Sequence, residues 1–217
     1  MAKKTSKKKK KGKLIKTKED KQLAWILVIL ILIIAGFVIS WFYIQSLKTF
    51  SYAGLEWQIE ERPGGEFDWH HTQFPTFYNP SKLFTLSLRN DPRKNNVPVN
   101  VDNWEFTRNA TIISLGEEAR ACDKLYISNQ VLTIFLSKAI GISTQGAISD
   151  KEIAEEQNIS FANCTSTNKT VILIQTSEQP SIEQEDNCYK LNIGDCKNFE
   201  TTERFITAIL EEIFMEA

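Results

Sequence analysis

The 217-residue chain lacks the motifs that mark several classes of enzyme. It has only two histidines, no Cys-x-x-Cys pair, no H-E-x-x-H and no G-x-S-x-G. These absences exclude the sequence patterns of zincins, thioredoxin-like redox proteins and α/β-hydrolases. Six Pro and nine Gly exclude a collagen-like or low-complexity chain, and 42% hydrophobic residues exclude wholesale disorder. We therefore predict no catalytic residue, no cofactor and no metal.

Charge is missing from one long stretch, residues 22–47. Within it, Leu23–Ile44 is almost wholly apolar. As a helix these residues span about 33 Å, enough to cross a hydrocarbon core of roughly 30 Å. Trp25 lies at one end and Trp41 at the other, where aromatic rings favour the headgroup level. The sequence predicts a transmembrane helix at 22–47.

The charges are segregated on the two sides of this segment. Residues 1–21 carry eleven Lys and two acids, a net charge of +9, whereas the rest of the chain carries −10. Clustered Lys beside a first membrane span stays cytoplasmic, so we predict a cytoplasmic N-terminus and an outside domain at residues 48–217. A cleaved signal peptide would have a shorter apolar region and small residues after it. Bulky Trp41, Phe42 and Tyr43 favour an uncleaved signal anchor instead.

The basic tail could also bind anionic lipid or nucleic acid. No aromatic residue lies among the lysines of Lys3–Lys21. We therefore interpret the tail as a topology signal with nonspecific lipid attraction, and we predict no nucleic-acid partner.

Residues 48–217 predict one α+β domain with a substantial core. In residues 48–107, apolar and polar positions alternate in three short runs, which favours antiparallel strands with one buried face. Residues 108–217 predict a β-α-β-β-α part that ends in an amphipathic helix from Thr201. The strand runs are 55–59, 84–88 and 97–101 in the first part, and 111–115, 171–175 and 189–193 in the second.

All four cysteines, Cys122, Cys164, Cys188 and Cys196, lie on the side of the membrane where oxidation is expected, which predicts two disulfides. A strand–helix–strand crossover makes residues 111–115 and 171–175 parallel. If the next strand returns antiparallel, Cys188 shares one sheet end with Cys122 and Cys196 shares the other with Cys164. We therefore predict Cys122–Cys188 and Cys164–Cys196.

Four sequons of the N-x-[ST] type occur in the predicted outside domain. They begin at Asn109, Asn158, Asn163 and Asn168. Three of them fall within residues 158–170, which predicts an exposed, glycosylated loop.

Two polar clusters have functional and structural interpretations. His70 and His71, with Glu66 and Asp68, could form a metal site or a general base, but adjacent residues on a strand point to opposite faces. We interpret them as a histidine pair without such a role. The run Arg89–Lys94 could bind a carboxylate or phosphate, but its Asn-Asp-Pro sequence favours a turn.

A further set of short stretches is Leu88–Lys94, Val97–Val99, Ile113–Leu115, Ala121–Cys122, Asn187–Tyr189, Asp195–Cys196 and Thr202–Phe205. These stretches resemble a group of single-pass membrane proteins from small-genome archaeal lineages, to which no activity is assigned. The resemblance covers most of residues 50–215 and implies an archaeal envelope setting and disulfide-bonded cysteines. It implies no catalytic residues.

This architecture favours a non-enzymatic envelope protein that binds a protein or glycan partner, or that serves as an accessory subunit of a membrane assembly. The alternative is an envelope-directed hydrolase or metal-assisted enzyme that uses His70 or His71 and nearby carboxylates. The lipid bilayer is the other expected partner, and the sequence makes no prediction of oligomeric state. A histidine with two convergent carboxylates in a pocket would favour the enzyme, and an apolar or aromatic patch would favour partner binding.

Overall fold

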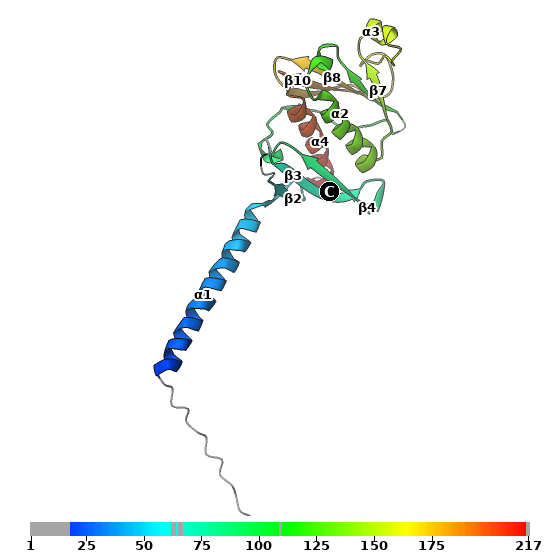
Figure 1. The fold of residues 1–217 in the computed structure, drawn as a ribbon. Coiled ribbons are helices and arrows are strands. Elements are labelled where there is room, and N and C mark those ends of the chain that lie inside the picture. Colours follow the sequence, from blue (N-terminus) through cyan, green and yellow to red (C-terminus); the bar gives the residue numbers. More distant parts are fainter. Residues whose placement is uncertain (1–17, 62–63, 65–66, 109, 216–217) are drawn as a thin grey trace, which may run out of the picture. The chain divides into compact units, whose positions relative to one another are not determined.

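The computed structural model describes residues 18–61, 64, 67–108 and 110–215 (Figure 1). The chain divides after Leu47 into two units. The first contains α1 (Lys18–Leu47), whose charge-free part is the 26 residues Gln22–Leu47. At 1.5 Å per residue this part is about 39 Å long, and its large apolar side chains are exposed. The chain thus has a helix with the length and composition of a membrane anchor.

The second unit begins with an antiparallel sheet in which each strand pairs with the next along the chain. The alternation seen in the sequence is confirmed here, since Trp57 and Leu86 are buried while Glu56 and Gln58 are exposed. One face of the sheet therefore packs on the core and the other faces solvent. The strands are β1 (Thr49–Tyr52), β2 (Leu55–Glu60), β3 (Trp69–Thr76) and β4 (Asn79–Leu88).

A six-stranded mixed sheet follows, in the order β5-β9-β10-β8-β6-β7. Strands β10, β8, β6 and β7 are parallel, whereas β9 is antiparallel to β10. Ile172 and Ile174 of β8 are fully buried on the face towards the helices. The strands are β5 (Val99–Asn100), β6 (Thr111–Leu115), β7 (Thr144–Ile148), β8 (Val171–Ser177), β9 (Ser181–Glu185) and β10 (Cys188–Gly194).

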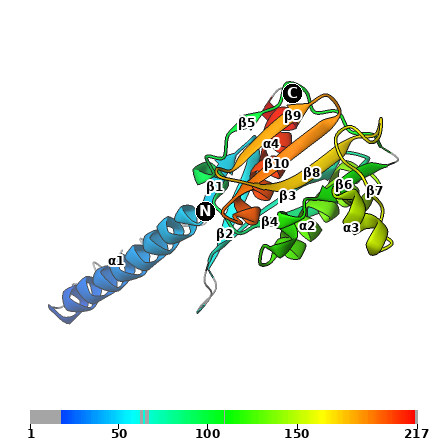
Figure 2. The same cartoon turned by 90° about the horizontal axis from the view of Figure 1, so that it is seen from above.

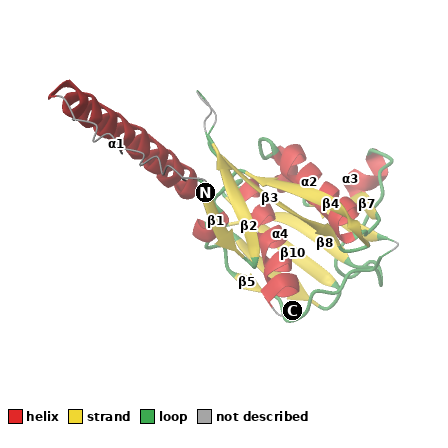
Figure 3. Ribbon diagram, turned by 90° about the horizontal axis from the view of Figure 1, so that it is seen from below, coloured by secondary structure: helices red, strands yellow, loops and turns green. Residues whose placement is uncertain are grey.

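Helices fill the space between the two sheets. Figure 1 shows the sheets on opposite sides of α2 and α4, and Figures 2 and 3 show the same layers from above and below. Phe205 and Ile209 of α4 join Trp57 and Ile172 in one core, so the α+β prediction is confirmed. The helices are η1 (Pro92–Lys94), η2 (Glu118–Ala121), α2 (Leu125–Ile134), η3 (Phe135–Ile140), α3 (Lys151–Glu156) and α4 (Asn198–Met215).

The predicted strand pattern missed four strands, β1, β3, β7 and β9, and misplaced a fifth. β9 and β7 each have few apolar residues, so neither shows a clear period of two. The run at 97–101 forms only the short strand β5, and β5 pairs with β9 in the mixed sheet rather than with the antiparallel one. β7 pairs with β6, about thirty residues earlier in the chain, and local periodicity does not report such a neighbour.

The predicted disulfide pairing is wrong. The structure pairs Cys122 with Cys196 and Cys164 with Cys188, each with Cα atoms 5.3 Å apart. Because β9 is the returning strand, β10 runs parallel to β8 instead of antiparallel. This brings Cys188 to the end of the sheet where Cys164 lies and Cys196 to the end where Cys122 lies.

Candidate functional site

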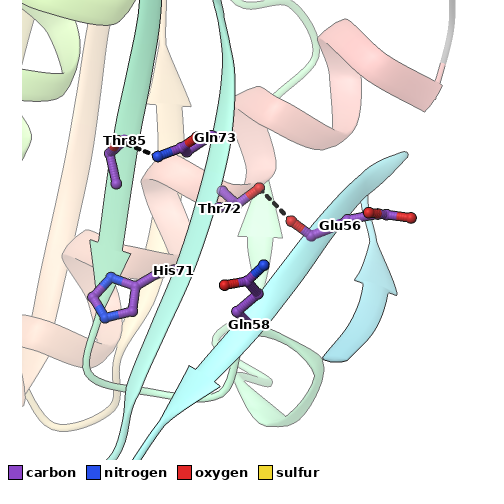
Figure 4. A pocket seen from close by; sticks show the side chains of 6 residues that line it. All are labelled: Glu56, Gln58, His71, Thr72, Gln73 and Thr85. Carbon is purple, nitrogen blue, oxygen red and sulfur yellow. Dashed lines mark hydrogen bonds between the residues drawn. The ribbon is translucent and has the colours of Figure 1, made fainter. Parts of the chain in front are cut away.

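The solvent face of the antiparallel sheet carries a polar hollow of about 300 Å³, which we call the sheet hollow (Figure 4). Its side chains come from three neighbouring strands. Gln73 Nε2 donates to Thr85 Oγ1 at 3.1 Å across β3 and β4. The lining residues are Glu56, Gln58, His71, Thr72, Gln73 and Thr85.

The two histidines point to opposite faces of β3, as expected for neighbours on a strand. His70 is 6% exposed and packs edge-on to the Phe50 ring, and burial lowers the pKa of its imidazole. His71 lies on the solvent face. Glu66, a candidate partner, lies outside the described residues. In the described part of the chain no three His, Cys, Asp or Glu side chains are grouped to hold a metal ion.

His71 contacts a serine and a carboxylate that the sequence reasoning missed. His71 Nδ1 lies 2.7 Å from Ser87 Oγ, and His71 Nε2 lies 3.1 Å from Glu60 Oε2. The register places Ser87 directly opposite His71 on β4. Trp69 joins the three in a smaller hollow of about 220 Å³. The cluster could have been found from the sequence if residues 55–59 had been paired with the strand that contains His71. That strand, β3, was not predicted.

The run Arg89–Lys94 forms a turn, as its Asn-Asp-Pro sequence predicted. Asp91 caps η1 by accepting from Arg93 N, and it also accepts two bonds from the Arg93 guanidinium at 2.9 and 2.7 Å. These bonds from Arg93 lower the pKa of the Asp91 carboxyl. The Arg93 guanidinium also lies 3.8 Å from the centroid of Phe50, and that of Arg89 lies 3.9 Å from Phe199. Both arginines are engaged by the protein itself.

A second hollow, of about 520 Å³ and lined mainly by aromatic and aliphatic residues, lies at the β3–β4 turn, and we call it the Tyr78 hollow. Gly141 ends η3 with a φ of +86°, and a Cβ at this position would lie 3.0 Å from Tyr78. The glycine therefore allows the close approach that shapes one wall. The lining residues are Phe77, Tyr78, Phe106, Arg108, Ile140, Gly141, Ile142 and Ile213.

One cation lies among these apolar side chains. Arg108 is exposed, and its guanidinium makes no hydrogen bond or ion pair with any residue that the structure describes. Tyr78 lines the hollow and is 52% exposed. A concave apolar site of several hundred Å³ with one polar anchor is typical of a ligand-binding pocket. The hollow therefore suits a ligand that combines an apolar part with an acidic group.

The sequons of the loop before β8 differ in their surroundings. Asn158 and Asn168 are exposed, whereas Asn163 is half-buried and its Oδ1 accepts from Thr165 N and Oγ1 at 3.1 Å. The middle residue of that third sequon, Cys164, is held in a disulfide. Asn109 lies outside the described residues.

In native material we expect glycans on Asn158 and Asn168 and none on Asn163. Folding and disulfide formation make the Asn163 side chain inaccessible to the glycosylating enzyme. Mass spectrometry of glycopeptides measures occupancy directly. Asn158→Gln and Asn168→Gln should each remove one glycan, and Asn163→Gln should leave the mass distribution of the glycans unchanged. A glycan on Asn163 would contradict this expectation.

Comparison of the chain with protein-family models, with curated proteins and with solved structures finds no match. The functional argument therefore rests on the geometry of these sites.

Proposed function

We propose that the protein is a membrane-anchored binding protein whose domain of residues 48–217 lies outside the cytoplasm and captures a partner protein in the Tyr78 hollow. The anchor is α1, and the Lys-rich residues before it favour a cytoplasmic N-terminus. The two disulfides fit an oxidising compartment, such as the archaeal envelope that the resemblance implies.

The single observation that carries the proposal is a hollow lined mainly by aromatic and aliphatic residues, with Arg108 at its wall and unpaired among the described residues. Tyr and Arg are the side chains that most often dominate binding energy at protein interfaces, and Tyr78 and Arg108 both line this hollow. Two half-buried aliphatic side chains, Ile140 and Ile213, favour an apolar peptide side chain over a sugar. Charge complementarity to Arg108 favours a neighbouring Asp or Glu in the same peptide segment.

The test presents the full chain, in detergent micelles, to a displayed library of short peptides. We expect enrichment of peptides in which a large apolar residue stands beside an acid. Tyr78→Ser should lower the affinity for the selected peptides about thirtyfold, since it removes a central apolar contact. Arg108→Glu should lower the affinity for these peptides at least about tenfold, and it should favour the same peptides with Lys in place of the acid.

Two matched variants control for general surface effects. Tyr126→Ser changes another exposed tyrosine, on α2, and Lys169→Glu makes a charge reversal in an exposed loop. Neither should alter affinity. The proposal is wrong if Tyr78→Ser and Tyr126→Ser select the same peptides with the same affinity. It is also wrong if the protein binds glycans on an array while no peptide is enriched.

A further inference from the structure

The cluster on the solvent face of the antiparallel sheet has the contacts of an activated serine. Ser87, His71 and Glu60 come from β4, β3 and β2, three strands that lie side by side. The imidazole lies between the hydroxyl and the carboxylate, at 2.7 Å from Ser87 Oγ and 3.1 Å from Glu60 Oε2. The contact with Ser87 is a hydrogen bond, whereas the contact with Glu60 has ion-pair distance without hydrogen-bond geometry.

The acid–imidazole contact decides which ring nitrogen can act as a base. The Glu60 carboxylate lies 3.1 Å from Nε2, so its negative charge favours a proton on that nitrogen and leaves the Nδ1 lone pair to face the Ser87 hydroxyl. A serine hydroxyl is a weak nucleophile unless an adjacent base takes its proton, and a third group commonly orients that base. Glu60 occupies the orienting position, with the roles of the two ring nitrogens exchanged relative to serine proteases.

We propose that Ser87 is a nucleophile that accepts an acyl group from small esters, with His71 as its base and Glu60 as a positioning residue. This differs from the sequence-based alternative, which relied on either histidine and its sequence neighbours. His70 is buried on the other face and takes no part. The 220 Å³ hollow and its Trp69 wall suit a short acyl or aryl group.

Acylation forms a bond to Ser87 Oγ and breaks the ester C–O bond. Ser87 Oγ forms a bond to the ester carbonyl carbon while its proton moves to His71 Nδ1. The ester C–O bond breaks, and the leaving alcohol takes the proton from His71. Water then attacks the acyl-serine in the same manner, which releases the carboxylic acid and restores the hydroxyl.

The surrounding sheet predicts that turnover is slow. β3 pairs with β2 on one side and with β4 on the other, so its backbone N–H groups serve the ladders. Among the described residues, β3 therefore offers no pair of free N–H groups near the cluster that could stabilise an oxyanion. In known enzymes, loss of one such donor lowers the rate by about 10²–10³. Covalent labelling is a more sensitive readout than steady-state hydrolysis.

The experiment treats the full chain in detergent with an alkyl fluorophosphonate and maps the adduct by mass spectrometry. In this reaction Ser87 Oγ bonds to phosphorus, fluoride leaves and His71 takes the proton. We expect one adduct, on Ser87, which Ser87→Ala abolishes. His71→Asn should slow labelling about a hundredfold, as expected for loss of a general base, and Glu60→Gln about tenfold.

Ser51 supplies the matched control because it is an exposed serine on β1, opposite Glu56 and thus on the same face. Ser51→Ala should leave labelling unchanged, and so should Tyr126→Ser, a change at an exposed tyrosine of α2. The test is independent of the binding proposal because this cluster and the Tyr78 hollow share no lining residue. Thermal unfolding of each variant verifies folding. The proposal is overturned if Ser87 stays unlabelled, if Ser51 labels as fast, or if folded His71→Asn labels at the wild-type rate.

Discussion

Removal of the Cys122–Cys196 disulfide is expected to lower the free energy of unfolding of residues 48–217 by about 4.5 kcal/mol. This bond closes a loop with a sequence separation of 74, whereas Cys164–Cys188 closes one of 24. In the chain-entropy model the shorter loop contributes about 3.5 kcal/mol. Urea denaturation of the full chain in detergent, followed by tryptophan fluorescence, measures both losses.

The double variant Cys122→Ala with Cys196→Ala also tests the pairing itself. With the pairing of the structure, this variant loses one bond and keeps the other, so no thiol is free to react with an alkylating reagent. With the pairing Cys122–Cys188 and Cys164–Cys196, both bonds would be lost and two thiols would react. Counting alkylated cysteines by mass therefore gives zero or two, and two would contradict the structure.

The second large effect is expected at Glu203, an acid of α4 that is only 3% exposed. Its Oε1 accepts from Arg89 N at 2.7 Å, and its Oε2 accepts from Asn90 N at 2.9 Å and from Asn90 Nδ2 at 2.7 Å. The carboxylate thus joins α4 to the chain that leaves β4. Glu203→Ala should cost about 3–5 kcal/mol, because it leaves buried donors without acceptors and opens a cavity.

Burial raises the pKa of Glu203 to about 7, against an ordinary value of 4.5, although the bonds from Arg89 and Asn90 act in the opposite direction. The folded protein therefore keeps a proton that the unfolded chain releases between about pH 4.5 and pH 7. The stabilisation is complete below about pH 4.5 and is lost as the pH rises through 7, and the difference amounts to about 3 kcal/mol.

A comparison of unfolding free energies at pH 5 and pH 8 isolates this term. Glu203→Gln should reduce the loss of stability between these two pH values by about 2–3 kcal/mol relative to wild type. Glu152→Gln, a change at an exposed acid of α3, should leave the pH dependence unaltered. Equal pH dependence in wild type and Glu203→Gln would rule out a titrating buried carboxyl.

For Glu203, the sequence indicates one property and only the structure shows another. It falls three residues before Ile206, on the apolar face of the predicted C-terminal helix, so helical periodicity alone places an acid in the core. Its partners are main-chain groups more than a hundred residues earlier. Periodicity predicts that such an acid is buried, but only the packing of α4 against the end of β4 shows what satisfies it.

The sequence by itself determined the features that depend on neighbouring residues. A charge-free run long enough to span a membrane, the Lys cluster before it, the alternation of β2 and β4 and the apolar face of α4 all follow from local composition and period. Only the tertiary structure decided the disulfide pairing, the Ser87–His71–Glu60 row and the Tyr78 hollow. Each of these depends on the order and register of strands far apart in the chain, and one unpredicted strand, β9, was enough to reverse β10 and exchange the partners of the four cysteines.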